Sequence, residues 1–330
     1  MEEVVIVGAG PCGLSAAVEL QRIGLEPLLI EKENVVHSIY LYPTYMQFFS
    51  TPELLEIGDY PFSTPNEKPF RLEALQYYRT IAARRELRVR AYHRVTEIKR
   101  GTDGASYELN VVDRSGSVTT VAARSVIVAT GYFDHPNLLG IPGEELSKVS
   151  HYFREAHPYT GTRVTVIGGS NSAVDAALEL QRAGAEVTVV YRGETYSPVI
   201  KPWVRPIFES MANKGRIQMR FRSQVVEIGP STVTISSEGK QEVIGNDFVL
   251  ALTGFRPDRS LLRSLGAAFQ ENDEVPIYNP ETMETTVPGI YIAGVAASGR
   301  NANEVFIETG RLHGRWIAQH LASKKGLLVK

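Results

Sequence analysis

Length, composition and charge exclude several classes of protein. The chain has 330 residues, 43% of them hydrophobic, which is enough to fill the cores of two domains. A net charge of −2 leaves no basic surplus for nucleic acid, and no apolar run reaches the ~20 residues of a transmembrane helix. The single cysteine excludes an internal disulfide and an all-cysteine metal site, and the seven histidines show no ligand spacing, so we predict no metal.

The N-terminal segment has the pattern of a dinucleotide-binding unit. A strand (residues 4–7) leads into a turn of sequence Gly-Ala-Gly-Pro-Cys-Gly (8–13), an amphipathic helix (14–23) and a second strand that ends at Glu31. The first glycine allows the tight turn, the second lets a pyrophosphate approach the backbone, and the third lets the helix pack on the strand. The helix N-terminus faces the phosphates, and the acid binds ribose hydroxyls. The residues that we assign to this first site are Gly8, Gly10, Pro11, Cys12, Gly13, Glu31 and Lys32.

The same unit recurs 160 residues later, with Gly168 in the place of Gly8. The helices that follow are also alike, since residues 16–22 read AAVELQR and residues 176–182 read AALELQR. A repeat of this length indicates a second nucleotide-binding unit. Here Tyr191 and Arg192 replace the acid, and a cation without an acid suits a ribose with a 2′-phosphate, although Arg192 could also be a solvated surface charge. We therefore predict FAD in the first unit and NADPH in the second, bound by Gly168, Gly169, Ser170, Asn171, Ser172 and Arg192.

The segment between the two units is predicted to complete the first one. An aromatic stretch from Val35 to Phe62 reads as a loop that packs either on the flavin ring or on the protein core. The elements predicted after it are a helix (71–85), a strand (87–92), a β-meander (95–98, 106–113 and 117–123) and a buried strand from Ser125 that ends at Thr130 and Gly131.

A Pro/Gly-rich linker (136–144) leads to the second unit, which begins at Arg163. The elements predicted from there are a loop (197–203), a helix (207–213), strands at 217–221, 225–228 and 232–235, a returning strand that ends at Gly254, a strand at 290–294 and a last helix (303–322). We therefore expect an α/β fold of two Rossmann-like, three-layer ββα dinucleotide-binding domains. The NADPH domain (141–249) is inserted into a discontinuous FAD domain (1–140 and 250–330).

These features together resemble the thioredoxin-reductase-like flavoproteins. The resemblance rests on two fingerprints, two strands that end in Thr-Gly and a final Tyr-Ile-Ala-Gly strand. It implies FAD in the discontinuous domain and NADPH in the insert. Two departures are visible: the redox Cys-x-x-Cys of that group is absent, and the acid that binds the flavin ribityl chain after Gly294 is replaced by Val295.

A closer resemblance is to the YpdA family of bacillithiol disulfide reductases. The segments that carry it are GAGPCG (8–13), FFS (48–50), ATGYFDHP (129–136), GGSNSAVD (168–175), YRG (191–193), IKPW (200–203) and NANE (301–304). The resemblance implies NADPH-dependent reduction, through FAD, of the disulfide of a low-molecular-weight thiol. Within this family both departures are expected. The remaining residues that we assign to the FAD site are Val95, Thr130, Gly131, Gly294 and Val295.

Cys12 is the only sulfur nucleophile of the chain. A helix N-terminus lowers the pKa of a thiol, whereas a bound phosphate raises it. As a catalytic residue Cys12 would form a mixed disulfide with the substrate thiol, and the alternative is a small residue that fills the turn. The last helix is expected to aim its N-terminus, near Asn303 and Glu304, at the pyrimidine edge of the flavin, with Glu304 facing away.

Two other enzyme classes stay open at this point. His151, which follows the linker, resembles a position in flavin monooxygenases, although their Phe-x-Gly lead-in is missing. A ferredoxin or flavodoxin reductase of the same fold would also lack Cys-x-x-Cys. The predicted strand at Val4 leaves no room for a signal peptide. We expect a cytoplasmic homo-oligomer that acts on a small-molecule disulfide, with neither nucleic acid nor membrane as a partner.

Overall fold

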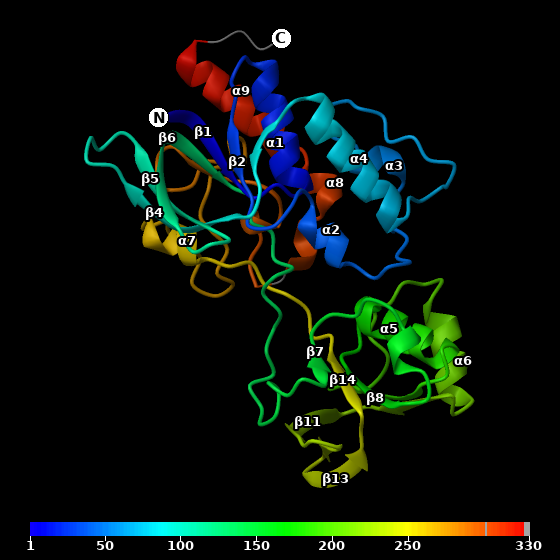
Figure 1. Ribbon diagram of the computed structural model, residues 1–330. Helices are drawn as coiled ribbons and strands as arrows, with labels where there is room; N and C mark the ends of the chain where they lie inside the picture. The colour runs from blue at the N-terminus through cyan, green and yellow to red at the C-terminus, as the bar shows by residue number, and fades with distance from the viewer. Residues whose placement is uncertain (301, 327–330) are drawn as a thin grey trace. The chain divides into compact units, whose positions relative to one another are not determined.

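The computed structural model describes residues 1–300 and 302–326 (Figure 1). The chain forms two compact units, each with a parallel sheet of its own. Unit 1 comprises Met1–Tyr40, Met46–His135 and the residues from Phe255 onward, and unit 2 comprises Leu41–Tyr45 and Pro136–Gly254. Unit 1 is therefore discontinuous, and unit 2 is largely a single insert.

The exchange points differ by about five residues from the expected boundaries at 140 and 250. The chain leaves unit 1 after His135 and returns to it after Gly254. Within unit 2, the Asn137 N–H donates to the Gly254 carbonyl at 2.9 Å, and within unit 1 the Arg256 N–H donates to the His135 carbonyl at 3.0 Å. The first hydrogen bond fixes the start of the linker to unit 2, and the second fixes the residue before the linker to unit 1.

The aromatic stretch 35–62 is less irregular than predicted. It contains two short helices, α2 (His37–Leu41) and α3 (Pro52–Leu55). Between them, Leu41–Tyr45 belongs to unit 2, where the Thr44 N–H donates to the Arg154 carbonyl at 2.8 Å. A contact between residues so far apart in the chain leaves no mark in a local pattern.

Unit 1 is organised around a parallel sheet. Its strands follow the order β3 (Arg88–Arg90), β2 (Leu28–Ile30), β1 (Glu2–Val7) and β6 (Val118–Val128), and β15 (Ile290–Ile292) also pairs with β6. The antiparallel strands β5 (Tyr107–Asp113) and β4 (His93–Arg100) extend the sheet from β6. Buried on both faces, β1 and β6 read as continuous apolar runs near their carboxyl ends.

Strand β6 corrects one prediction, because residues 117–123 and the strand from Ser125 are one continuous strand. Its first half pairs antiparallel with β5, and its second half pairs parallel with β1 and β15. The change of partners occurs near Ala123, which pairs with both Glu2 and Tyr107. Because a strand can change partners without a turn, the sequence carries no break at this point.

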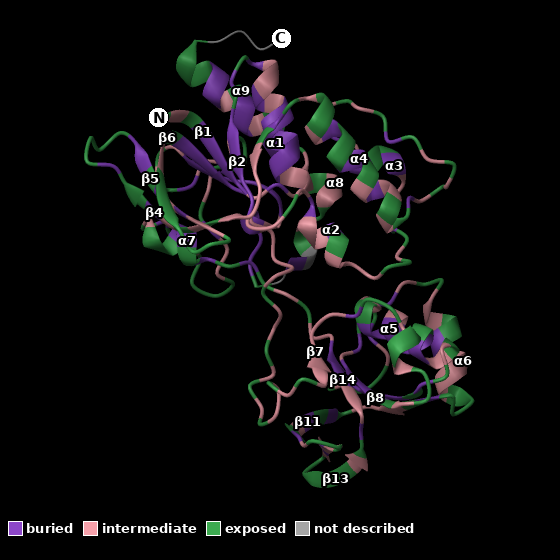
Figure 2. Cartoon of the chain, in the orientation of Figure 1, coloured by how far each residue is buried: buried purple, intermediate pink, exposed green. Residues whose placement is uncertain are grey.

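Helices α1 (Pro11–Arg22) and α9 (His313–Lys325) pack closely against each other in unit 1. A Cβ at Gly314 would lie 2.5 Å from the Ala16 Cα, so only glycine permits this approach. The Ser15 hydroxyl donates to the Arg311 carbonyl at 2.6 Å. The remaining helices of this unit include α4 (Arg71–Arg84) and α7 (Ser260–Ser264). Figure 2 shows that the buried faces of α1 and α9 meet over the sheet.

The predicted last helix, 303–322, is wrong as a single element. After β15 come the 3₁₀ turns η2 (Gly294–Ala297) and η3 (Ala302–Glu304), the short helix α8 (Ile307–Gly310) and then α9. Helix α8 starts where the Phe306 N–H donates to the Thr309 hydroxyl at 3.3 Å. Glu304 is exposed, and the side chain of Asn303 lies outside the described part of the chain. The predicted aim of one long helix at a flavin therefore does not apply.

Unit 2 has a five-stranded parallel sheet. The strand order is β10 (Ile217–Arg220), β9 (Glu186–Val190), β8 (Arg163–Ile167), β14 (Phe248–Ala251) and β7 (Val149–Ser150). The helices of the unit are η1 (His157–Tyr159), α5 (Asn171–Arg182) and α6 (Arg205–Asn213). A separate antiparallel sheet is formed by β11 (Ser223–Ile228), β12 (Thr232–Ser237) and β13 (Lys240–Gly245), the last of which we did not predict.

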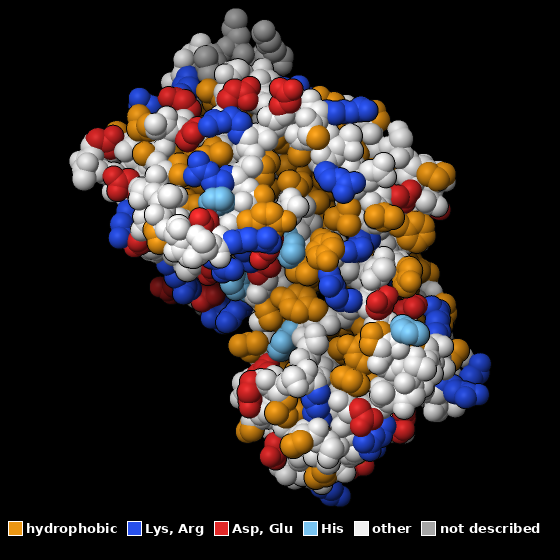
Figure 3. All heavy atoms as spheres, viewed as in Figure 1, with side chains coloured by type: hydrophobic (Ala, Val, Ile, Leu, Met, Phe, Trp, Pro, Cys, Tyr) orange, Lys and Arg blue, Asp and Glu red, His pale blue; other side chains and the backbone are white. Residues whose placement is uncertain are grey.

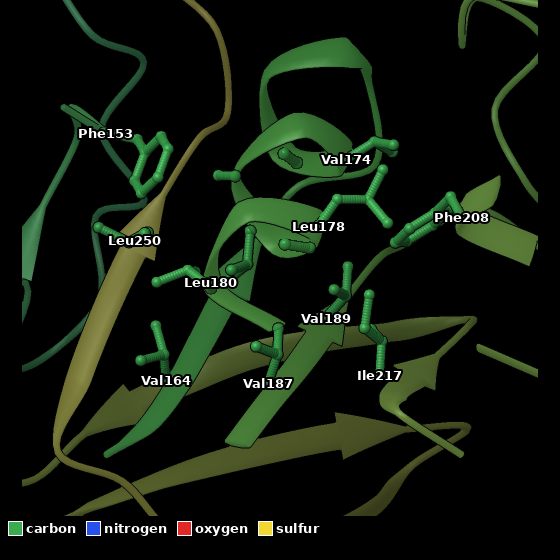
Figure 4. Packing of buried hydrophobic residues seen from close by; sticks show 14 of the residues in the cluster. Phe153, Val164, Val174, Leu178, Leu180, Val187, Val189, Phe208, Ile217 and Leu250 are labelled. Carbon is green, nitrogen blue, oxygen red and sulfur yellow. The ribbon is translucent and has the colours of Figure 1, made fainter. Parts of the chain in front are cut away.

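Three layers account for the core of unit 2. On one face of the parallel sheet, Val174, Leu178 and Leu180 of α5 pack with Val187 and Val189 of β9 (Figure 4). The opposite face packs against the antiparallel sheet through a second cluster, made of Ile167, Val190, Val225, Ile228, Val233, Ile235 and Val249. Helices, parallel sheet and antiparallel sheet therefore form the predicted ββα arrangement.

Two further properties bear on function. None of the helices in residues 1–300 and 302–326 is long and apolar enough to cross a membrane. Within the same residues, no group of three or more His, Cys, Asp or Glu side chains is placed to hold a metal ion. On the face shown in Figure 3, basic and acidic side chains are interspersed.

Candidate dinucleotide-binding sites

The first Gly-rich turn connects β1 to α1 at the carboxyl edge of the unit 1 sheet. Gly8 has φ +107°, and its N–H donates to the Ile30 carbonyl at 2.8 Å. A Cβ at Gly8 would lie 2.5 Å from the Ala129 carbonyl oxygen, and a Cβ at Gly13 would collide with the Gly8 carbonyl oxygen. Gly10 is different, because a Cβ there would meet nothing within 4 Å. Gly8 and Gly13 are therefore required by the close packing of the backbone, whereas Gly10 leaves space at the edge of the turn.

Glu31 directly follows β2 and is tied to that turn. Its carboxylate accepts the Ala9 N–H at 2.8 Å and the Glu33 N–H at 3.0 Å. Burial raises the pKa of the Glu31 carboxyl, and the two N–H donors act in the opposite direction. An ionised carboxylate has about four acceptor positions, so two remain for ribose hydroxyls. Lys32 is already paired with Asp134 at 2.6 Å.

The other predicted residues of the first site lie around the same sheet edge. Thr130 and Gly131 lie just beyond β6, after Ala129, and the Thr130 Cα lies 3.4 Å from the position of a Cβ on Gly8. Val95 lies in β4, two residues after His93, whose N–H donates to the Glu31 carbonyl at 2.9 Å. Gly294, with φ +67°, begins η2 one residue beyond β15. The fold therefore brings these distant segments to one edge.

Cys12 lies in the first turn of α1, beneath the glycines of two other segments. A Cβ at Gly294 would lie 2.8 Å from the Cys12 Sγ, and one at Gly310 would lie 2.9 Å from it. Burial, together with the charge of Glu308, raises the pKa of the Cys12 thiol to about 12. The lowering expected from the helix N-terminus is therefore outweighed, and the group is a protonated thiol at neutral pH.

The second Gly-rich turn has the same design in unit 2. Gly168 has φ +141°, its N–H donates to the Val190 carbonyl at 3.1 Å, and a Cβ there would lie 2.5 Å from the Leu252 carbonyl oxygen. Ser170 and Ser172 are exposed at the start of α5. The Asn171 side chain bridges to the following loop, accepting from the Lys201 N–H at 2.9 Å and donating to the Val199 carbonyl at 3.0 Å.

Tyr191 fills the space next to this turn. A Cβ on either Gly169 or Gly193 would collide with its ring, so the ring lies between two glycines. Arg192 is exposed and has no ion-pair partner among residues 1–300 and 302–326. The carboxyl end of β9 thus presents an aromatic ring and an unpaired cation where the first unit has an acid.

Two buried polar side chains were missed by sequence reasoning. His313, at the start of α9, accepts the Gly294 N–H on Nδ1 at 3.2 Å, and Arg259 donates to the carbonyls of Ala296 and Ser298. Both are less than 10% exposed. A lone histidine in a predicted helix and a lone arginine in a predicted loop carry no local signal of burial.

His151 lies in unit 2 and is engaged locally. Its Nε2 lies 3.3 Å from the Glu144 carboxylate, which also accepts the N–H groups of Leu139 and Gly140 at 2.7 Å each. The His151 Nδ1 is buried and has no hydrogen-bond partner within the described residues. The contacts of His151 are those of a residue that anchors the linker.

Lowering the pH from 7 toward 4 is expected to destabilise unit 1 through His313. Burial lowers the pKa of its imidazole to about 4, whereas the unfolded chain binds the proton near pH 6.5. The stabilisation is therefore complete above pH 6.5 and is lost as the pH falls, by up to about 3 kcal/mol. Urea titrations of the parent and of His313→Asn at several pH values measure this effect. An equally steep fall in both proteins would contradict it.

Comparison with known proteins extends over nearly the whole chain. The family described as pyridine nucleotide-disulphide oxidoreductase matches residues 5–294. The chain is 49% identical to the bacilliredoxin reductase Bdr of Bacillus subtilis over 325 residues, which is 98% of each chain. Two solved structures entitled bacillithiol disulfide reductase Bdr (YpdA) are also similar. The one from Bacillus cereus has 51% identity and a TM-score of 0.95, and the one from Staphylococcus aureus has 45% and 0.93, each covering 98% of this chain and 99% of its own.

Proposed function

Because this chain belongs to the pyridine nucleotide-disulphide oxidoreductases and, within them, to the YpdA (Bdr) family of flavoprotein disulfide reductases, we propose that it uses NADPH and FAD to reduce bacillithiol disulfide. The predicted family and the predicted oxidoreductase class are confirmed by these similarities. The monooxygenase and carrier-reductase alternatives lose their support, because a ferredoxin–NADP reductase is 29% identical and a flavin-containing monooxygenase 22% identical to the chain, against 49% and 51% for the disulfide reductases.

The choice of cofactors rests on the chemical difference between the carboxyl edges of the two parallel sheets. Unit 1 offers an open position at Gly10 beside the buried Glu31 carboxylate, which suits a pyrophosphate next to a free ribose. Unit 2 offers the unpaired Arg192 guanidinium, which suits a 2′-phosphate. The residues present fit FAD in the first unit and NADPH in the second.

Most of the predicted residues then have a role in holding a cofactor. In unit 1 the turn 8–13 would cradle the pyrophosphate, Glu31 would accept ribose hydroxyls, and the backbones at 130–131 and 294–295 would border the flavin side. In unit 2 the turn 168–172 would hold the NADPH pyrophosphate. When bound, FAD supplies two-electron transfer, and the protein supplies position and electrostatics.

We retain Cys12 as the proposed nucleophile of the disulfide step. As a protonated thiol, Cys12 must lose its proton before it can attack, and burial and the charge of Glu308 both oppose that loss. The resulting thiolate would attack one sulfur of the substrate, forming a mixed disulfide with Cys12 and releasing one thiol. Freeing the second thiol and restoring Cys12 would take two electrons and two protons, and the electrons are what FAD and NADPH would supply when bound.

Replacing Cys12 by serine is expected to lower disulfide-dependent turnover by at least about a hundredfold, because a hydroxyl cannot form the mixed disulfide. The FAD content should stay that of the parent, since serine has nearly the same size. Steady-state NADPH oxidation and the absorbance ratio of flavin to protein give the two values. Full turnover with normal FAD content would exclude the nucleophile role and would indicate direct reduction of the substrate.

The function itself is tested by anaerobic NADPH oxidation with the purified protein. We expect consumption that depends on bacillithiol disulfide and releases two thiols per NADPH. A second candidate substrate is the disulfide form of a bacilliredoxin, because the Bacillus subtilis relative is named for reducing that protein. Oxidation that requires oxygen alone, or that ignores both disulfides, would contradict the proposal. Its cytoplasmic location and assembly as a homo-oligomer are also proposed, and light scattering of the purified protein measures the latter.

A further inference from the structure

The turn η2 lies where the first nucleotide site would receive its flavin. It leaves the carboxyl end of β15, which pairs with β6 at the centre of the unit 1 sheet. Ligands of open parallel sheets bind outside this edge. Gly294 starts the turn directly over the Cys12 sulfur, so η2 and the pyrophosphate turn are in contact.

One end of the turn is held by a buried cation. Arg259, which is 6% exposed, donates from Nη1 to the Ala296 carbonyl at 2.6 Å and from Nη2 to the Ser298 carbonyl. The two parallel donors of a guanidinium fit two carbonyls of one turn, a geometry that lysine cannot reproduce. Among the described residues, no carboxylate lies within ion-pair distance of this group. Its charged neighbours, Asp258, Glu274 and Arg263, act only through space.

The other end of the turn is held by a buried imidazole. His313 is 6% exposed, and its Nδ1 accepts the Gly294 N–H at 3.2 Å. The ring stacks on Trp316 with 5.3 Å between ring centroids and 25° between planes, which fixes its orientation. A neutral ring is needed, because a protonated Nδ1 cannot accept a hydrogen bond. Arg259 and His313 thus restrain η2 from residue 294 to residue 298.

We propose that Arg259 and His313 are positioning residues for FAD, which hold η2 in the conformation that receives the cofactor. They act on the turn rather than on the cofactor. The proposal rests on the proposed function only in taking FAD as the occupant of unit 1. The expected consequence is a preformed site whose affinity depends on two side chains outside it.

Titration of apoprotein with FAD, followed by the quenching of flavin fluorescence, tests this role. Arg259→Met and His313→Leu are expected to raise the dissociation constant for FAD by about tenfold or more, as loss of one or two charged or buried hydrogen bonds implies. Arg259→Lys should also bind FAD more weakly than the parent, since lysine keeps the charge but cannot donate to both carbonyls at once. His313→Asn should be close to the parent, because the amide oxygen can accept the same N–H. The Michaelis constant for NADPH should stay unchanged in all four.

Matched controls come from the same helices. Arg263→Met lies one turn along α7 and removes a surface ion pair with Glu274, and His320→Leu lies on α9 and removes a contact with Glu284. Both should bind FAD like the parent. Circular dichroism of the apoprotein shows whether Arg259→Met and His313→Leu fold. If either does not, the FAD affinities of Arg259→Lys and His313→Asn are compared with that of the parent instead. An FAD affinity within twofold of the parent in folded Arg259→Lys, or equal affinities for His313→Asn and His313→Leu, overturns the proposal.

Failure of this inference is distinguishable from failure of the proposed function. If the parent binds FAD but reduces no disulfide, the function is wrong and the affinity series still decides the role of the two side chains. If the parent binds no FAD, the choice of cofactor is wrong and both proposals fall. If the parent is an active disulfide reductase and the variants bind FAD normally, only the positioning role is removed.

Discussion

Replacing Gly10 by alanine should leave the apoprotein as stable as the parent and still weaken FAD binding by at least about tenfold. A Cβ at Gly10 meets nothing within 4 Å, and the backbone there has φ −72°, which any residue adopts. The methyl group therefore costs nothing until a pyrophosphate approaches the turn. In that case it occupies the space through which the phosphate oxygens reach the N–H groups of α1.

The neighbouring glycine gives the contrast that makes this prediction sharp. A Cβ at Gly13 would collide with the Gly8 carbonyl oxygen, so Gly13→Ala is expected to destabilise the apoprotein as well as the FAD complex. Unit 2 carries Ala173 at the equivalent position, and its Cβ lies 3.2 Å from the position of a Cβ on Gly168. An alanine is therefore tolerated at this position in unit 2 but not in unit 1.

Thermal unfolding of apoproteins and FAD titrations separate the two effects. Gly10→Ala should change only the FAD dissociation constant, whereas Gly13→Ala should change both the midpoint of unfolding and the constant. If Gly10→Ala binds FAD like the parent, the pyrophosphate does not lie on this turn. A loss of apoprotein stability in Gly10→Ala would instead show that the open space is occupied in the folded protein.

Replacing Arg192 by methionine is expected to raise the Michaelis constant for NADPH by about 10- to 100-fold, with little change for NADH. The guanidinium is exposed and unpaired among the described residues, so it loses no protein partner when it binds a phosphate. A charge-assisted hydrogen bond to such a group contributes about 1.5–3 kcal/mol. Methionine keeps the length of the side chain, and the ring of Tyr191 between Gly169 and Gly193 should keep the turn in place.

Arg182→Met is the matched control, since Arg182 lies in the same unit at the far end of α5 and pairs with Glu179 on the same helix. It should leave both Michaelis constants unchanged. The ratio of kcat/KM for NADPH to that for NADH is the decisive quantity, because damage to the flavin site would lower both values together. An unchanged ratio in Arg192→Met would assign this arginine to the solvated surface and the 2′-phosphate to other residues.

The glycine turns were predictable from the sequence, because each requires a local spacing that few other structures need. The repeat was equally visible, and with it the two parallel sheets. Boundaries set by distant contacts were not predictable: β6 continues where its partners change, and Leu41–Tyr45 joins unit 2 through a hydrogen bond from Thr44 to Arg154. The start of α8 depends on a hydrogen bond from the Phe306 N–H to the Thr309 hydroxyl, which a helical pattern hides.

The candidate site shows the same division. Gly8, Gly13 and Glu31 were predictable from the local sequence. In the structure, a Cβ on either glycine would collide with a backbone carbonyl oxygen, and the Glu31 carboxylate accepts the Ala9 N–H. Arg259 and Ala296 are 37 positions apart in the chain, and His313 and Gly294 are 19 apart. A local sequence pattern therefore cannot predict their hydrogen bonds. The raised pKa of the Cys12 thiol was also beyond sequence reasoning, because it comes from burial next to Gly294 and Gly310 and from the charge of Glu308.

The discontinuity of unit 1 sets an order of events during synthesis on the ribosome. Unit 2 is almost complete once Gly254 has emerged, and its sheet needs no later segment. The first 135 residues must wait for β15, which pairs with β6, and for α9, which covers α1. Until then they expose an unpaired edge of a parallel sheet, the kind of surface that favours aggregation. The inserted unit is therefore expected to fold first, and the N-terminal half to depend on chaperones until the C-terminal strand arrives.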